Sequence, residues 1–388
     1  MKRAGIALLG IFFSLAISCS TSDKNVNSVR NVLKDDVLKM AKQNLNEEPI
    51  TVTAYKAERS EGGIHDFYSE GDYWWPDPEN PDGPYIRLDG KTNPDNFVEH
   101  RHAMIRFSQI VGNLTSAYLI NHDHCYVDAV LKHVRAWFVD DSTKMNPSLL
   151  YAQAIKGRAS GRGVGIIDTI HLMEVAQSLY RLEASGVIPE EDLKATKQWF
   201  SDYLSWLKTH QYGVNEMDAK NNHGTCWVMQ AAAFARYIGD AEMLDFCRRR
   251  YKEILLPNQM AVDGSFPQEL RRTKPYGYSL FNLDAMATIC QILSDKNDDL
   301  WTYTADGVKN IQRGIEFLYP YVKDKNTWPY NKDVMYWDQW PVAQPFLVFG
   351  GIRFDNNDWL NTWSALNHFP DNEEVIRNLP VRNPLIWL

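Results

Sequence analysis

Cysteine is scarce in this sequence, and its placement excludes two classes of site. The 388 residues include five cysteines, at positions 19, 125, 226, 247 and 290, and no two of them form a C-x-x-C pair. A zinc ribbon or a dithiol redox motif is therefore excluded. Segments 99–102 and 122–125 are rich in potential ligands, but neither has the spacing of a known metal site, so we expect none. We expect the cysteines at 226, 247 and 290 to pack as small hydrophobic residues in helices.

The sequence also lacks an excess of positive charge. Its 41 lysines and arginines are outnumbered by 49 acidic residues, which gives a net charge of −8. Proteins that bind nucleic acid present a basic surface, so we expect no nucleic-acid partner. A polyanionic partner would have to be bound in a local basic cleft. The hydrophobic fraction of 44% is typical of a folded globular chain.

A hydrophobic run long enough to span a bilayer is missing as well. The run at residues 4–17 is shorter than the ~20 residues that a spanning helix needs. Lys2 and Arg3 precede it and small residues lead from it to Cys19, which resembles a bacterial lipoprotein signal. We therefore predict a signal peptide over residues 1–18, a lipid anchor at Cys19 as the one membrane contact, and a flexible tether over residues 19–35. The protein would be held in the periplasm or on the outer-membrane surface of a Gram-negative bacterium; a cleaved secretion signal with an incidental cysteine is the alternative.

Strand patterns are scarce, whereas helical periodicity runs through most of the chain. Apolar residues recur at spacings of three and four within residues 104–118, 127–138, 167–182 and 199–207, and polar turns such as 212–215 separate the helical stretches. Many helices with short links predict stacked helical hairpins, without the fixed repeat period of a tetratricopeptide-like array. We predict an all-α protein in which residues 36–388 form a single (α/α)6-7 toroid, an incomplete barrel of helical hairpins; an extended solenoid is the alternative.

Two segments depart from the helical pattern. Residues 72–96 hold five prolines, which forbid a regular helix, together with Tyr73, Trp74, Trp75 and Tyr85. A long ordered loop of this kind either plugs a core or lines a site. Residues 157–165 are rich in glycine but lack the Lys-Ser/Thr ending of a phosphate-binding loop, so we expect no nucleotide. The arginines of this second segment could bind a carboxylate or a phosphate.

Two further segments contain the residue types that one class of reaction needs. Residues 221–225 read Asn-Asn-His-Gly-Thr, and residues 266–279 are basic and aromatic. β-Elimination of a uronic acid polymer needs hydrogen bonds or positive charge on the sugar carboxylate, a base for the C5 proton and an acid for the departing O4. Asparagine and arginine supply the first; histidine or tyrosine with a shifted pKa supplies the others. A helix cap with a hydrogen-bonded histidine is the alternative.

Four blocks of the chain together resemble a known enzyme family. Residues 72–90, 151–169, 221–225 and 266–279 are similar to the alginate lyase-like polysaccharide lyases with an α/α toroid, and among these most of all to polysaccharide lyase family 38. The shared motifs are Trp-Trp-Pro-Asp-Pro, and Asn-Asn-His followed by an arginine-rich strip and a tyrosine. The resemblance implies β-elimination of a polyuronate, either alginate/polymannuronate or glucuronan. It also implies a mechanism without a metal or an organic cofactor.

The resemblance implies roles for individual residues. Asn222 would bind the sugar carboxylate, and His223 would act as base or neutralise that carboxylate. Arg272 would stabilise charge, and Tyr278 would be the acid, and also the base in a syn elimination. In mannuronate and glucuronate H5 and O4 lie on one face, so Tyr278 serves both; in guluronate they lie on opposite faces, so His223 would be the base.

Some assignments stay open at this stage. The family's arginine and tyrosine are seven residues apart, which selects Arg271, whereas alignment of the preceding Glu-Leu selects Arg272, which we favour. Tyr276 is a weaker rival to Tyr278. The candidates for substrate contacts are Trp75, Gln153, Arg158, Arg162, Arg271 and Tyr276.

Two other classes of function remain as alternatives. An inverting glycoside hydrolase can occupy the same toroid and needs two carboxylates ~6.5–9.5 Å apart, for which Asp168, Glu269 and Asp284 are candidates. A non-catalytic glycan-binding lipoprotein would also use aromatic loops. The preferred uronan, endo or exo action and the oligomeric state are not predicted.

Overall fold

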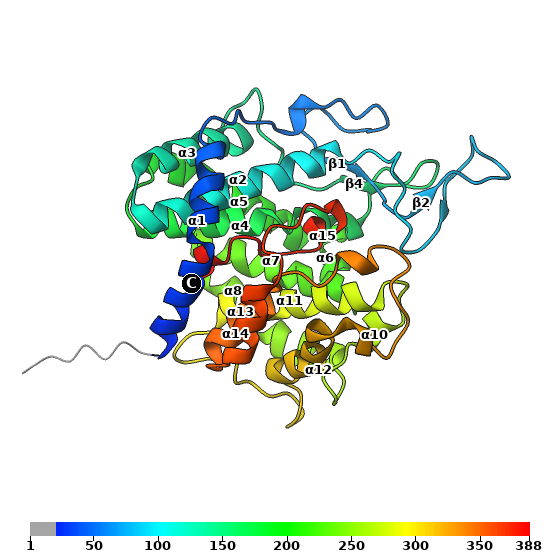
Figure 1. The fold of residues 1–388 in the computed structure, drawn as a ribbon. Helices are drawn as coiled ribbons and strands as arrows, with labels where there is room; N and C mark the ends of the chain where they lie inside the picture. The colour runs from blue at the N-terminus through cyan, green and yellow to red at the C-terminus, as the bar shows by residue number, and fades with distance from the viewer. Residues whose placement is uncertain (1–20) are drawn as a thin grey trace, which may run out of the picture.

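The computed structural model describes residues 21–388, so the predicted signal peptide and Cys19 lie outside the described residues. This part of the chain is mainly helical (Figure 1). Its α-helices are α1 (Thr21–Asn44), α2 (Glu99–Asn121), α3 (His124–Phe138), α4 (Leu172–Ala184), α5 (Glu190–Thr209), α6 (Gln211–Met217), α7 (Asn222–Ile238), α8 (Ala241–Arg250), α9 (Leu256–Gln259), α10 (Pro267–Leu270), α11 (Pro275–Leu293), α12 (Ile311–Lys323), α13 (Pro345–Arg353), α14 (Asn357–Ala365) and α15 (Glu373–Arg377).

Four short strands and several tighter turns complete the elements. The strands are β1 (Tyr68–Glu70), β2 (Trp74–Trp75), β3 (Ile86–Arg87) and β4 (Tyr151–Ala154). The 3₁₀ helices are η1 (Val52–Ala54), η2 (Gly163–Thr169), η4 (Lys325–Thr327), η5 (Trp337–Gln339) and η6 (Pro384–Trp387), and η3 (Tyr251–Leu255) is a π-helical turn.

Helices α7 and α11 lie at the centre of the fold. α7 packs against α4, α5, α8 and α11, while α11 also packs against α12 and α13. Every residue of α11 except Gln291 is buried, as expected for a helix surrounded on all sides. The helices form an all-α toroid that does not close into a complete barrel, so the predicted fold class is confirmed.

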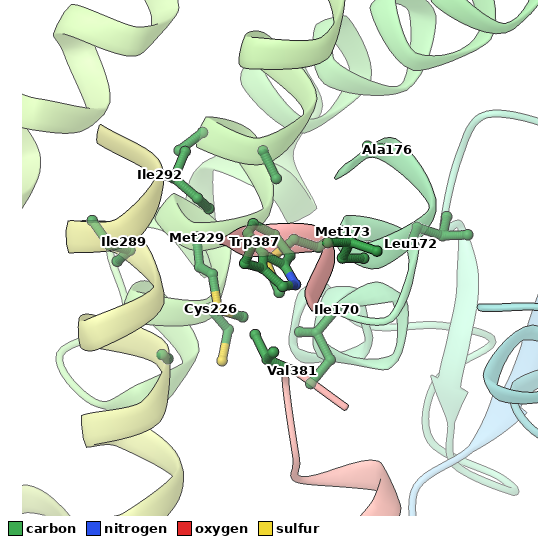
Figure 2. Packing of buried hydrophobic residues seen from close by; sticks show 14 of the residues in the cluster. Ile170, Leu172, Met173, Ala176, Cys226, Met229, Ile289, Ile292, Val381 and Trp387 are labelled. Atoms are coloured by element: carbon green, nitrogen blue, oxygen red, sulfur yellow. The ribbon is translucent and has the colours of Figure 1, made fainter. Parts of the chain in front are cut away.

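Side chains from several helices meet in the core beside α7. Figure 2 shows Met173 of α4, Met229 of α7 and Ile289 of α11 around Trp387 of η6. The cysteines at 226, 247 and 290 are buried, as predicted, and the one at 125 is exposed. The last described turn of the chain is therefore part of the same core as the central helices.

Local sequence explains where several helices begin and end. Asp123, Asp240 and Asn356 each accept a hydrogen bond from a backbone N–H group in the first turn of α3, α8 and α14. Gly239 ends α7 in the left-handed conformation, with φ of 81°, which glycine adopts without steric cost. The polar turn predicted at residues 212–215 is wrong, because these residues lie within α6.

The two segments without a helical pattern pack together. β2 and β3 form an antiparallel pair inside the loop at residues 72–96, and β1, just before this loop, pairs in parallel with β4. A Cβ atom at Gly161 would lie 1.9 Å from the Leu150 carbonyl oxygen. Glycine therefore allows the segment at residues 157–165 to approach the chain beside β4 closely.

The flexible tether predicted over residues 19–35 is wrong for its described part. From residue 21 the chain forms α1, which packs against α2 and α13. Val29, Leu33, Val37 and Ala41 recur at a spacing of four and are buried in one stripe. The segment has a polar composition, but this spacing is enough to fix it on the toroid. None of the described helices has the length and apolar character needed to cross a membrane.

Candidate functional site

One cavity of about 280 Å³ lies between the loop at residues 72–96 and the starts of α7 and α11. Side chains from β4, η2 and α15 complete its wall. The predicted catalytic residues come from two separate segments, and all of them line this cavity: Asn222, His223, Arg272 and Tyr278. An amide, an imidazole, a guanidinium and a phenol therefore meet at one place.

Asn222 is held at the first turn of α7 by a buried carboxylate. Its backbone N–H group donates a hydrogen bond to Glu269 Oε1 (2.8 Å), and its side-chain Nδ2 donates to Oε2 (2.7 Å). Glu269 thus pairs with a backbone N–H group that has no partner within the helix. Burial raises the pKa of Glu269, and the hydrogen bonds from Asn222 oppose the rise without cancelling it.

His223 is paired with a second buried carboxylate. Its Nδ1 lies 2.5 Å from Oε1 of Glu216 on α6, whose side chain is 2% exposed. Burial lowers the pKa of His223, but the charge and the hydrogen bond of Glu216 outweigh burial and raise the pKa above its ordinary value. The ring therefore keeps its proton to a higher pH than a free imidazole does.

Tyr278 lies in the first turn of α11 and contacts the loop across the cavity. Its hydroxyl oxygen is 2.7 Å from that of Tyr73, and the Arg272 guanidinium lies 4.6 Å from its ring centroid. Burial raises the pKa of Tyr278 well above its ordinary value, Tyr73 adds to the rise and Arg272 opposes it. The phenol therefore holds its proton near neutral pH.

Arg272 joins the same loop to the segment before α11. Its Nη2 donates to Oδ1 of Asp89 (3.1 Å), and the Thr273 hydroxyl donates to Oδ2 of Asp89 (2.9 Å). Arg272 lines the cavity, whereas Arg271 is exposed and lies outside its wall. Of the two arginines that the sequence left open, the geometry favours Arg272.

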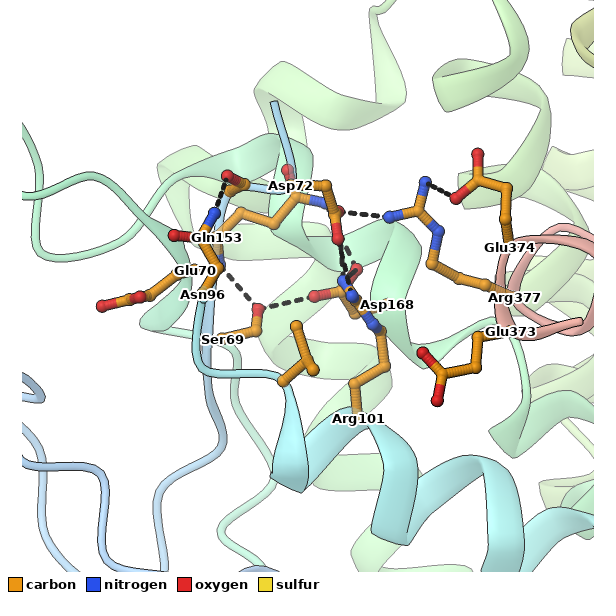
Figure 3. A network of polar contacts seen from close by, with 12 residues as sticks. Ser69, Glu70, Asp72, Asn96, Arg101, Gln153, Asp168, Glu373, Glu374 and Arg377 are labelled. Atoms are coloured by element: carbon orange, nitrogen blue, oxygen red, sulfur yellow. Dashed lines mark hydrogen bonds and ion pairs between the residues drawn. The ribbon is translucent and has the colours of Figure 1, made fainter. Parts of the chain in front are cut away.

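A buried network of charges forms part of the cavity wall (Figure 3). Arg101 Nη2 donates to Asp72 Oδ1 (2.6 Å), and its Nη1 lies 3.4 Å from Asp168 Oδ1. Arg377 of α15 pairs with both Asp72 and Glu374. Burial raises the pKa of Asp72, but Arg101 and Arg377 outweigh burial and hold the pKa of this carboxyl well below its usual range. Asp72 and Arg377 line the cavity, and no sequence pattern identified either as a site residue.

Two of the predicted substrate contacts, Gln153 and Arg162, line the cavity. Gln153 Nε2 donates to Asp168 Oδ1 (3.2 Å), and Arg162 Nε donates to the Gln153 carbonyl (2.8 Å). Gln153 has φ of 50°, in the left-handed region that residues other than glycine rarely adopt. Such backbone strain costs about 1–3 kcal/mol and is concentrated at functional sites.

Four of the predicted substrate contacts lie outside the cavity wall: Trp75, Arg158, Arg271 and Tyr276. The prediction for Tyr276 is wrong, because its side chain is fully buried and its hydroxyl donates to the Tyr321 carbonyl (3.0 Å). Trp74, the neighbour of Trp75 in β2, lines the cavity instead of Trp75, because successive side chains of a strand face opposite sides. The Arg158 guanidinium lies 5.5 Å from the ring centroid of Trp74, so it supports the wall from outside.

Each of the three carboxylates proposed for a hydrolase forms hydrogen bonds or an ion pair with other groups of the protein. Asp168 lines the cavity but accepts a hydrogen bond from Ser69 Oγ (2.6 Å) and pairs with Arg101. Glu269 binds Asn222, and Asp284 is fully buried away from the cavity, where it accepts a hydrogen bond from a backbone N–H group of α13. The two acidic residues that line the cavity therefore both pair with arginine, which does not fit a hydrolase.

Potential metal ligands do not converge in the described part of the chain. Within residues 21–388, no group of three or more histidine, cysteine, aspartate or glutamate side chains could hold a metal ion. In the histidine-rich segment at 99–102, His100 contacts the Tyr68 N–H group and the Tyr55 carbonyl through its two ring nitrogens. Its partners are therefore backbone groups.

Comparison with known proteins gives one family. A sequence model of the alginate lyase family matches residues 51–328. No curated protein matches the chain.

Solved structures with the same fold are also alginate lyases. An alginate lyase from Bacteroides ovatus is 29% identical, with a TM-score of 0.79 over 94% of this chain and 97% of that one. Alginate lyase A1-III from Sphingomonas species A1 is 17% identical, with a TM-score of 0.55 over 91% of this chain and 94% of that one. A variant of A1-III in complex with a tetrasaccharide is 15% identical, with a TM-score of 0.57 over 91% and 93% of the two chains.

Proposed function

Since this chain belongs to the alginate lyase family and is a polysaccharide lyase, we propose that it cleaves mannuronate-rich alginate or glucuronan by β-elimination in the cavity described above. The residues that we assign to the reaction are Asn222, His223, Arg272 and Tyr278. The observation that supports this assignment is their convergence on one cavity from separate segments of the chain. The new non-reducing end of the product would carry a 4,5-unsaturated uronate.

Asn222 and His223 form the site for the sugar carboxylate in this proposal. Both stand in the first turn of α7, where the helix dipole favours an anion. The pairing with Glu216 favours the imidazolium form of His223, and Arg272 lies close enough to interact with the same ring, so cationic hydrogen-bond donors line this end of the cavity. Hydrogen bonds and positive charge on the carboxylate stabilise the negative charge that develops when the C5 proton leaves.

Tyr278 moves both protons in this proposal. Its phenol holds a proton near neutral pH and can give it to O4 as the C4–O4 bond breaks. The same oxygen accepts the C5 proton, and the electron pair of the C5–H bond becomes the C4–C5 double bond. Arg272 and Lys274 lie against the ring and stabilise negative charge on the phenolic oxygen during the transfer.

This division of roles supports one class of substrate. A single oxygen reaches H5 and O4 together only when both lie on the same face of the sugar, as in mannuronate and glucuronate. Guluronate needs a base on the opposite face, and there the raised pKa of His223 leaves less of the neutral imidazole, the form that can accept a proton. We therefore expect polymannuronate and glucuronan to be cleaved faster than polyguluronate.

Neighbouring sugars would be bound by the rest of the wall. Arg162 lines the cavity and makes its hydrogen bonds to Gln153, without an ion pair to a carboxylate among the described residues. Its guanidinium lies 5.7 Å from the ring centroid of Trp74. These residues offer a cation for a second uronate carboxylate and an aromatic edge for its ring.

The reaction class is tested by the ultraviolet absorbance of the conjugated double bond on polymannuronate, glucuronan and polyguluronate. We expect the absorbance to rise on the first two polymers. A hydrolase would release reducing ends without this rise, and a glycan-binding protein would do neither, so each of these results contradicts the proposal.

Replacement of Tyr278 by phenylalanine tests the assignment of the site. Because the phenolic oxygen carries both protons, Tyr278→Phe should lower kcat by about 100- to 10,000-fold. Tyr276→Phe is the matched control, since it removes a core hydroxyl two residues away; its activity should stay near wild type while its stability falls by about 1 kcal/mol. A Tyr278→Phe protein with wild-type activity would show that the assignment is wrong.

The N-terminal segment supports a proposal about location. Its charged start, its short apolar run and the cysteine at position 19 fit an exported protein anchored by lipid on the bacterial envelope. Mass spectrometry of the protein purified from its native membranes should find an acylated Cys19 as the first residue. An unmodified N-terminus at another position would contradict the anchor.

A further inference from the structure

Glu216 is a buried carboxylate to which the proposed reaction gives no direct role. It lies on α6 with a side chain that is 2% exposed, and among the described residues its one ion pair is with Nδ1 of His223. A carboxylate removed from water is costly unless a cation or hydrogen-bond donors compensate for it. Here the compensating group is an imidazole that lines the cavity.

The position of Glu216 is fixed by tight packing around α6. A Cβ atom at Gly213 would lie 2.0 Å from the Leu207 carbonyl oxygen, and one at Gly224 would lie 2.2 Å from the Ala219 carbonyl oxygen. Arg250 Nη2 also donates to the Met217 carbonyl (2.7 Å), at the end of α6. The backbone that carries Glu216 is therefore held closely against the end of α5 and the start of α7.

The charged groups around His223 come from several elements. Glu216 on α6 and Glu269 on α10 raise the pKa of the ring, whereas burial and Arg272 lower it. Arg162, which precedes η2, lies close enough to Glu216 to interact with its charge. The Glu216 carboxylate, in direct contact with Nδ1, is the strongest of the groups that favour the cation.

We infer that Glu216 is a positioning residue for the elimination: it holds Nδ1 of His223 so that Nε2 is left for the substrate, and its carboxylate places a negative charge against the ring. The inference rests on the proposed function in one respect, namely that His223 meets the sugar carboxylate. It adds a residue outside the cavity wall that sets the charge inside it. Loss of the carboxylate should change the pH range of activity without removing any group that touches the sugar.

Glu216→Gln separates charge from orientation. The glutamine oxygen can still accept the hydrogen bond from Nδ1, but it no longer stabilises the cation, so the pKa of His223 should fall by about 1–3 units. A group that works in its protonated form is active below its pKa, so the alkaline limb of kcat/KM should move to lower pH. The pKa of His223 is read directly by NMR titration of its ring, assigned with a His223→Gln protein.

Two controls distinguish this role from a structural one. Asp192→Asn removes the charge of another buried carboxylate, one that pairs with Arg135 between α3 and α5 and lies outside the cavity. It should leave the pH profile and the His223 titration unchanged. In a His223→Gln background, Glu216→Gln should cause no further loss of kcat/KM, because a residue that acts through His223 has nothing left to act on.

The outcomes separate this inference from the proposed function. An unchanged His223 titration in a folded Glu216→Gln protein overturns the inference, whatever the activity. A lowered His223 pKa with a shift of the acidic limb upholds the role of Glu216 but overturns the proposal that the imidazolium is the working form. Because the titration needs no substrate, the inference can be tested even if the wild-type protein cleaves none of the polymers.

Discussion

Arg272 stands between the carboxylate of Asp89 and the phenol ring of Tyr278. The Asp89 carboxylate accepts one hydrogen bond from Nη2 of this guanidinium and another from the Thr273 hydroxyl. The guanidinium also lies against the ring of Tyr278, where negative charge develops in the proposed transfer. The same side chain therefore fixes the loop at residues 72–96 and stabilises the reacting oxygen.

Arg272→Ala should lower kcat/KM by about 100- to 1000-fold, because a cation aimed at developing charge is lost. The matched control is Arg271→Ala, which removes an exposed arginine outside the cavity and should stay within about twofold of wild type. Both values come from initial rates of absorbance increase on polymannuronate. Equal losses in the two proteins would contradict the choice of Arg272.

The direction in which a side chain points limited what could be predicted about single residues. The residue types of the site could be predicted from the sequence, but the choice between neighbouring residues depended on which side chain faces the cavity. Tyr276 and Tyr278 are two residues apart on α11, a spacing that places them on different sides of a helix. Trp74 and Trp75 alternate in β2 for the corresponding reason in a strand.

Among the elements, α1 and α6 show where sequence patterns were misleading. The helices with a strong apolar stripe, such as α3 and α5, lie where periodicity predicted them. The buried stripe of α1 takes only every fourth residue, and residues 21–35 of this helix were predicted as part of a tether. α6 is a helix of seven residues whose Gly213 suggested a turn, so its Glu216 was not recognised as a partner of His223. In both cases tertiary packing outweighs weak local preference.

The packing of α1 gives a prediction about stability. Leu33 is 2% exposed on the buried side of α1, so Leu33→Ala should cost about 2–5 kcal/mol of unfolding free energy. The cavity contains no residue of α1, so kcat should be unchanged. Urea unfolding measures the first quantity and the absorbance assay the second. Lys34→Ala, on the exposed side, is the control, and its free energy of unfolding should stay within about 0.5 kcal/mol of wild type. If Leu33→Ala lost as little free energy of unfolding as this control, α1 would not be packed on the toroid.

For the whole molecule, the charge network joins parts of the chain that no local pattern relates. Arg377 Nη2 lies 3.4 Å from the Tyr73 hydroxyl, although the two residues are 304 positions apart. Asp72 forms ion pairs with Arg101 of α2 and with Arg377 of α15. Contacts between residues so far apart in the sequence follow from the tertiary arrangement of the helices. The sequence alone therefore predicted the fold class but not this wall of the site.

Arg377→Met should lower both the stability of the protein and its activity. Removal of one partner from a buried ion pair costs about 3–5 kcal/mol, although Arg101 remains to compensate Asp72 in part. Activity should fall as well, because the Tyr73 hydroxyl loses a neighbour beside Tyr278. Arg353→Met removes a pair with Asp299 nearer the surface and should cost about 1 kcal/mol or less without loss of activity. Urea unfolding and initial rates measure both effects, and a neutral Arg377→Met protein would contradict a structural role for α15.

The place of Arg377 in the cavity wall also governs when the site becomes competent as the chain folds. Helices such as α2, α3 and α5 can form early, since each needs only nearby chain. The wall, by contrast, needs Asp72 and Arg377, which are far apart in the sequence. A partly folded chain can therefore carry most of its secondary structure while the proposed catalytic cavity is still open on one side, and competence arises in one late step.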